Sequence, residues 1–158
     1  MIILGIDPGT ATTGWGIIKT AQNTLSCLDY GTIETPKEDA ESRRLLNISK
    51  ELDSLIKKYH PDMASMEKIF FFKNPKTVIP VTQARGVMLL GLEKHRVPIY
   101  EFTPPQIKTA TTGYGRATKK QIQEMVKRLL SLEKIPKPDD AADALAAAIC
   151  LSFQKKYE

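Results

Sequence analysis

The sequence predicts an α/β protein in which helices pack on a mixed β-sheet. The chain opens with a strongly apolar run, and two further strand-like segments follow it after short turns, which is typical of hairpins. Beyond about residue 40, apolar residues at helical spacing alternate with short apolar runs. Hairpin strands followed by alternating strands and helices imply a sheet with both antiparallel and parallel neighbours.

Five strands are expected, and the first is the most apolar. Residues 1–6 read MIILGI, which is typical of a central strand that is buried on both faces. Pro8 and Gly9 then turn the chain and end the strand. The short turns around the next two segments favour antiparallel pairing with it. The expected strands cover residues 1–6, 14–20, 25–34, 62–67 and 97–102.

Five helices complete the pattern. Apolar residues at helical spacing predict the first, which Pro61 ends. The second is expected to hold Pro80 in its first turn, where proline is tolerated. Capping boxes of the form Thr-x-x-Gln at Thr103 and Thr118 start the third and fourth. The expected helices cover residues 45–59 and 77–94, begin at 104 and 119, and run from 139 to about 154.

The length and composition predict one domain over residues 1–158. Cys27 and Cys150 do not have metal-ligand spacing, so we expect two buried thiols in a reducing compartment. No secretory leader opens the chain, and its longest apolar run, residues 144–151, is too short to span a bilayer. We therefore expect a cytoplasmic protein without a membrane partner.

Positive charge is concentrated in one part of the chain. Residues 68–137 carry fourteen Lys and Arg against four acids, whereas the rest carries nine against fourteen. The formal net charge of +5 is therefore the sum of a +10 segment and a −5 remainder. Many of these lysines are solvated helix faces, but the asymmetry favours a surface that meets a polyanion.

Acidic residues stand at two expected strand ends and at one helix start. Asp7 and Glu67 each end a strand, so parallel pairing of the two strands would place both carboxylates at one sheet edge. Asp140 and Asp143 are three residues apart and share a helix face. A capping role alone explains an acid such as Asp139 or Asp140 at a helix start. Asp143 lies deeper among apolar residues, where it needs a cation.

Converging carboxylates repel one another, so a divalent cation is their natural partner. Ligands that are all oxygen select Mg²⁺ or Mn²⁺ over zinc. Two such ions, of which one activates water and one stabilises the leaving oxygen, are the usual apparatus for phosphodiester hydrolysis. This chemistry agrees with the basic segment of the chain.

Short motifs follow one another from residue 3 to about residue 149. They are Gly5-Ile6-Asp7-Pro8-Gly9, Thr13-Gly14-Trp15-Gly16, Glu67 with Phe70, Lys73-Asn74, Gln83-Ala84-Arg85-Gly86 and Asp140-Ala141-Ala142-Asp143-Ala144-Leu145-Ala146. Together and in this order, they resemble the RuvC family of bacterial Holliday-junction resolvases. The resemblance implies a ribonuclease-H-like fold, a homodimer and symmetric, Mg²⁺-dependent nicking of four-way DNA junctions in recombination and repair. It further implies two Mg²⁺ ions per site, which Mn²⁺ can replace, and a branch-migration helicase as a partner.

The resemblance also assigns site residues. The family's catalytic and metal-binding acids fall on Asp7, Glu67, Asp140 and Asp143. The residues that it implies for DNA binding are one base-stacking aromatic and several lysines, namely Phe70, Lys73, Lys108 and Lys119. Asp139 adds a third acid beside the last pair; it could compete as a ligand, although we favour a capping role.

Residues 68–75, KIFFFKNP, hold three consecutive phenylalanines. Neither a helix nor a strand directs three neighbours to one side, so at least one ring is expected to be exposed. An exposed ring between lysines is a surface on which unpaired bases stack. A core ring with two rings against a dimer partner explains the pattern nearly as well, and which of Phe70, Phe71 and Phe72 meets DNA stays open.

Two other functions remain open from the sequence. A non-catalytic junction-binding relative would keep the fold, although all four matched acids are present. An ATP-binding phosphotransferase-like domain would use the turn after the first strand to hold phosphates, but such folds need a second copy of the domain, and none is found.

Overall fold

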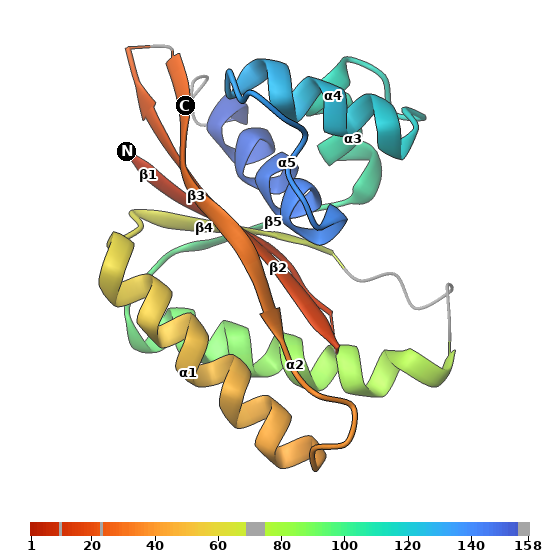
Figure 1. Ribbon diagram of the computed structural model, residues 1–158. Coiled ribbons are helices and arrows are strands. Elements are labelled where there is room, and N and C mark those ends of the chain that lie inside the picture. The colour runs from red at the N-terminus through yellow and green to blue at the C-terminus, as the bar shows by residue number, and fades with distance from the viewer. Residues whose placement is uncertain (10, 23, 69–74, 155–158) are drawn as a thin grey trace.

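The computed structural model describes residues 1–9, 11–22, 24–68 and 75–154 (Figure 1). One five-stranded sheet has the order β3-β2-β1-β4-β5. β1 pairs antiparallel with β2, β2 antiparallel with β3, β1 parallel with β4, and β4 parallel with β5. The strands are β1 (Ile2–Asp7), β2 (Thr12–Ala21), β3 (Thr24–Glu34), β4 (Met63–Glu67) and β5 (Ile99–Phe102). The mixed sheet expected from the sequence is confirmed.

Five helices cover the two faces of this sheet. They are α1 (Glu41–Tyr59), α2 (Pro75–Lys94), α3 (Pro104–Thr112), α4 (Lys119–Leu129) and α5 (Asp139–Gln154). Figure 1 shows α1 and α2 on one side of the sheet and α3, α4 and α5 on the other. We call these sides the α1–α2 face and the α5 face.

The alternation of side chains along β1 explains why helices cover both faces. Ile3 belongs to the core on the α5 face, and Leu4 and Ile6 belong to the core on the α1–α2 face. All three side chains are at most 1% exposed. The central position predicted for the first strand is therefore correct, and each layer of helices buries one half of its apolar surface.

Two expectations need correction. α2 begins at Pro75, so Pro80 lies inside the helix and not in its first turn. The helix tolerates it because proline removes only one backbone hydrogen bond, to an acceptor that itself lies in the first turn.

Cys150 is buried as expected, but Cys27 is only half-buried because it lies on the edge strand β3. Burial raises the pKa of both thiols to about 11.

In the part of the chain that the structure describes, we find no helix with the length and apolarity that crossing a membrane requires.

Candidate active site

Asp7 and Glu67 end two neighbouring parallel strands. Ile6 of β1 is the partner of Met66 of β4, so the next residue of each strand stands at the same sheet edge. Ile6 and Met66 both point into the core of the α1–α2 face. Because side chains alternate along a strand, Asp7 and Glu67 point to the α5 face. The juxtaposition expected from parallel pairing is confirmed.

α5 brings the other two acids to this edge. A methyl group added at Gly14 of β2 would overlap the backbone carbonyl of Asp140, and one added at Gly5 of β1 would overlap that of Ala144. The first turns of α5 therefore lie directly on the backbones of β1 and β2. Gly14 is also the cross-strand partner of Asp7, so the start of α5 lies beside that carboxylate. This contact needs glycine, because any side chain would lift the helix away from the sheet.

The pKa of Asp7 reflects this convergence of carboxylates. Its pKa is raised to about 8, first by burial and then by the charges of Asp143, Glu67 and Asp140, in that order. Asp7 keeps some solvent exposure at the sheet edge, but protein atoms crowd its carboxyl group. Three elements therefore direct four carboxylates at one region, and their mutual repulsion is only partly relieved by the positive charge of Lys119.

Lys119 is the cation that Asp143 was expected to need. Its Nζ lies 3.1 Å from Asp143 Oδ2 and 3.6 Å from Asp139 Oδ2. Partial burial acts to lower the pKa of Lys119, but its hydrogen bond to Asp143 and the nearby carboxylates raise it overall. Burial raises the pKa of Asp143 in turn, while Lys119 opposes that change. The capping box of Thr118 fixes Lys119 as the first residue of α4.

A cavity of about 250 Å³ joins two of the acids to two of the three lysines that the family resemblance singled out. Lys108 of α3 and Lys119 of α4 line it together with Glu67 and Asp143. Apolar side chains complete its wall: Pro104, Ile107, Ile122 and Ala146. An anionic group that enters this cavity meets ammonium groups next to carboxylates, and it is partly shielded from water.

Asp139 is the first residue of α5, which agrees with the helix start expected from the sequence. It lies in the first turn of the helix and does not precede it as an N-cap residue. Its carboxylate lies 2.8 Å from Lys137 Nζ and also faces Lys119. The hydrogen bond to Lys137 is the main reason why the pKa of Asp139 is lowered. Its charge is therefore already neutralised by two lysines.

The predicted DNA contacts Phe70 and Lys73 lie outside the described residues, as do Phe71 and Phe72. Arg85, for which the sequence alone indicated no role, reaches from α2 to the neighbouring strand ends. Its guanidinium forms an ion pair with Glu101 of β5 and lies 2.7 Å from Met66 Sδ, one residue before Glu67. The acid at position 101 within an otherwise mostly apolar strand was the available signal for this pair.

The donor set suits a hard divalent cation, because it consists of carboxylate oxygens that carry more negative charge than Lys119 neutralises. Within residues 1–9, 11–22, 24–68 and 75–154, no three Asp, Glu, His or Cys side chains already form a closed metal cluster. The carboxylates are therefore neighbours whose oxygens are not yet gathered around one point.

Comparison with known proteins agrees with this geometry. The model of the family "Crossover junction endodeoxyribonuclease RuvC" matches residues 3–151. The crossover junction endodeoxyribonuclease RuvC of Petrotoga mobilis is 57% identical over 159 residues, which cover 100% of this chain and 98% of the relative. That of Clostridioides difficile is 51% identical and covers 100% and 94%.

A solved structure, T. thermophilus RuvC in complex with Holliday junction substrate, superimposes with a TM-score of 0.94 at 28% identity. The superposition covers 99% of this chain and 96% of that one. The fold is therefore ribonuclease-H-like, and the chain belongs to the RuvC family of crossover junction endodeoxyribonucleases.

Proposed function

We propose that this protein is a structure-specific endonuclease that resolves four-way DNA junctions by hydrolysing phosphodiester bonds, with residues 1–158 acting as one nuclease domain. Membership of the RuvC family supports the activity. The observation that carries the assignment of the site is the convergence of Asp7, Glu67, Asp140 and Asp143 from β1, β4 and α5. The phosphotransferase alternative finds no support in family membership, and the acids argue against a relative without activity.

The four acids are proposed to hold the metal. RuvC-family nucleases are metal-dependent, and we propose two Mg²⁺ ions per site, with Mn²⁺ as a substitute. When bound, such ions activate water and stabilise the leaving oxygen. Asp7 and Glu67 stand at strand ends, and Asp140 and Asp143 share one helix turn, so the backbone brings all four side chains to one region.

Lys108 and Lys119 are proposed to contact the DNA backbone in the cavity beside the acids. Both lysines line the cavity that also contains Glu67 and Asp143, which supports a role for their ammonium groups in holding a phosphate beside the acids. Losing one such contact should lower the slope of log affinity against log salt by about 1. Lys73 and a stacking ring at Phe70 remain proposals that rest on the family resemblance.

We also propose that two copies act as a dimer through α2. Ile79 and Leu90 on α2 are 67% and 56% exposed, and they lie on one helix face with the exposed Gln83 and Gly86. These two apolar side chains are exposed on the same helix face, and symmetric contact with a second copy would cover both. Leu90→Glu should shift the sedimentation coefficient from dimer to monomer, whereas Leu46→Glu, on the exposed part of α1, should not.

The partners outside the junction are proposals as well. A branch-migration helicase is the partner that the resemblance implies, and a chromosomal substrate places the enzyme in the cytoplasm.

The test is incubation of the purified protein with an end-labelled four-way junction in Mg²⁺ or in EDTA. We expect paired nicks at symmetric positions of two strands in Mg²⁺ and intact junction in EDTA. A protein that binds the junction but does not nick it in Mg²⁺ or Mn²⁺ would be a binding relative. A protein that cuts linear duplex as fast as junction would not be a structure-specific resolvase.

A further inference from the structure

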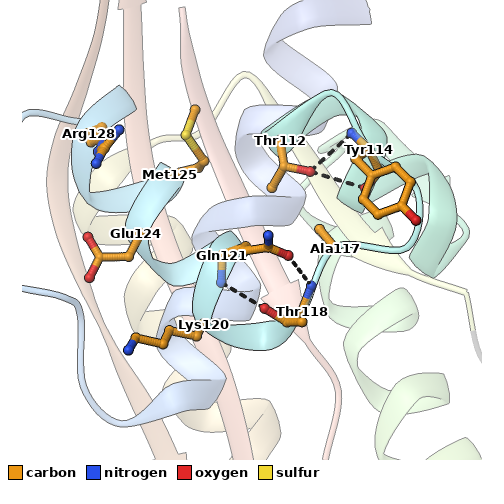
Figure 2. A pocket seen from close by; sticks show the side chains of 9 residues that line it. All are labelled: Thr112, Tyr114, Ala117, Thr118, Lys120, Gln121, Glu124, Met125 and Arg128. Atoms are coloured by element: carbon orange, nitrogen blue, oxygen red, sulfur yellow. Dashed lines mark hydrogen bonds between the residues drawn. The ribbon is translucent and has the colours of Figure 1, made fainter.

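A second hollow of about 490 Å³ lies between the end of α3 and the outer side of α4 (Figure 2). We call it the α3–α4 hollow. Ala117 and Met125 are apolar members of its lining, and Figure 2 shows the ring of Tyr114 on one side. Its volume falls in the range of about 300–1,000 Å³ that is typical of ligand sites. Its lining residues are Thr112, Tyr114, Ala117, Thr118, Lys120, Gln121, Glu124, Met125 and Arg128.

The hollow is held in shape by its own polar groups. The Thr112 hydroxyl shares its one proton between two acceptors, the backbone carbonyls of Lys108 at 2.8 Å and Tyr114 at 3.1 Å, and it accepts from the backbone N–H of Tyr114. On the opposite side, the capping box of Thr118 and Gln121 fixes the start of α4. The Tyr114 side chain is nevertheless 58% exposed. A fixed backbone therefore presents a bare aromatic ring, a preorganised arrangement that lowers the entropy cost of binding.

The rim of the hollow carries net positive charge. Glu124 is the one acid among its lining residues. Lys120 and Arg128 line the hollow, and Arg116 is exposed in the turn next to Tyr114. A basic rim complements a polyanion. Phosphates alone, however, would need neither apolar lining residues nor an exposed ring.

We propose that the α3–α4 hollow binds an unpaired base of a DNA strand, with Tyr114 stacked on the base and with Lys120 and Arg128 on the flanking phosphates. An aromatic ring within a basic groove is the arrangement that binds single-stranded nucleic acid without reading its sequence. This inference rests on the proposed function for the source of the strand, which is a junction opened near its crossover.

The hollow is positioned to act together with the active site. Lys119 lines the cavity that contains Glu67 and Asp143, and its two neighbours Thr118 and Lys120 line the hollow. A strand that passes over the start of α4 therefore reaches both sites through adjacent residues. Holding a displaced base on one side of this turn would keep the strand from closing back into duplex while its phosphate is at the acids.

The experiment measures binding of a short fluorescent oligothymidylate by anisotropy, in the presence of EDTA so that cleavage does not contribute. Tyr114→Ala should weaken binding about tenfold, the equivalent of roughly 1.4 kcal/mol for the loss of one stacked base. Tyr114→Phe keeps the ring and should bind as the unmodified protein does. Lys120→Ala and Arg128→Ala should each lower the salt slope by about 0.7. Lys50→Ala, which removes an exposed lysine of α1, is the matched charge control and should change neither quantity.

A photo-crosslinking experiment identifies the residue that contacts the base. An oligonucleotide that carries 5-iodouracil should photo-crosslink to Tyr114, and peptide mass spectrometry locates the adduct. If Tyr114→Ala binds as tightly as Tyr114→Phe, or if the crosslink falls only outside the hollow, the base-binding inference is wrong and the hollow serves another partner. Failure of junction nicking by a protein that retains the Tyr114-dependent binding would overturn the proposed function alone.

Discussion

The two faces of the sheet differ in how far their acidic side chains are balanced by nearby cations. On the α1–α2 face, Asp53 lies 2.6 Å from both Lys57 Nζ and His95 Nε2, and Arg85 pairs with Glu101. These acids meet a cation on the same or an adjacent element. On the α5 face, Asp7 has three further carboxylates nearby, and among the residues that the structure describes Lys119 is the cation that acts against their repulsion. One face uses ion pairs to hold helices in place, whereas the other keeps an excess of negative charge that a ligand has to neutralise.

The largest expected effect distinguishes the two faces by activity. Asp7→Asn, Glu67→Gln, Asp140→Asn and Asp143→Asn should each slow junction nicking by about a thousandfold or more, because each removes a proposed metal ligand. Junction binding in Ca²⁺ should persist, since the lysines remain. Asp53→Asn, an isosteric change on the α1–α2 face, should nick normally. If Asp139→Asn is inactive and Asp140→Asn is active, the ligand shifts by one residue.

A second effect concerns stability and pH. The raised pKa of Asp7 means that the folded protein holds a proton there that the unfolded chain releases near pH 3.8. Without a divalent cation, the free energy of unfolding should therefore fall by a few kcal/mol as pH rises from about 4 to 8. Asp7→Asn should flatten this decline in urea titrations with EDTA and should be the more stable protein at pH 8. Equal slopes for the two proteins would mean that Asp7 is not the titrating group.

Asp53 should show the opposite sign. Hydrogen bonds from Lys57 and then His95 lower its pKa, so its contribution to stability exists at neutral pH and is lost as pH falls below the ordinary aspartate range.

Divalent cations should raise the melting temperature at pH 8 in the unmodified protein and in Asp53→Asn, but not in Asp7→Asn. A similar rise in all three proteins would indicate a cation site elsewhere.

The Arg85–Glu101 pair should contribute to stability and only indirectly to chemistry. The Arg85 side chain is 16% exposed, and the Glu101 oxygen that it meets is buried. Arg85→Met should lower the free energy of unfolding by roughly 2 kcal/mol, less than for a fully buried pair, because Glu101 keeps one third of its exposure. The double change with Glu101→Leu should recover most of the loss. Failure to recover would mean that Arg85 acts through Met66 and not through the acid.

The smallest expected effect is on the surface of the α1–α2 face. Lys57→Ala removes an exposed partner of Asp53 within one helix, and ion pairs of this kind contribute little. Thermal unfolding should be almost unchanged, and so should nicking.

By contrast, Lys119→Ala removes a cation of similar exposure on the α5 face. It should both weaken junction binding and lower the single-turnover rate.

Much of the architecture is local and was therefore predictable. The capping boxes at Thr103 and Thr118 start α3 and α4 where the sequence places them, because the signal and the structure lie within four residues. The ends of two strands, at Asp7 and Glu67, were also predictable, because the apolar run of each strand stops there. The start of α2 was missed by two residues, because proline at position 80 was taken for a first-turn residue.

Other features depend on contacts between distant parts of the chain. The amino-acid sequence by itself determined which residues are acidic, which side of each strand and helix is apolar, and where the capping boxes start α3 and α4. Only the tertiary structure decided that Lys119 meets Asp143, that Arg85 meets Glu101, and that the α3–α4 hollow stays open. Hydrophobic patterning directs each element to a face of the sheet, but it does not set the register of one element against another. That register follows from close packing, as where the bare backbone of Gly14 lets α5 settle onto β2 beside Asp7.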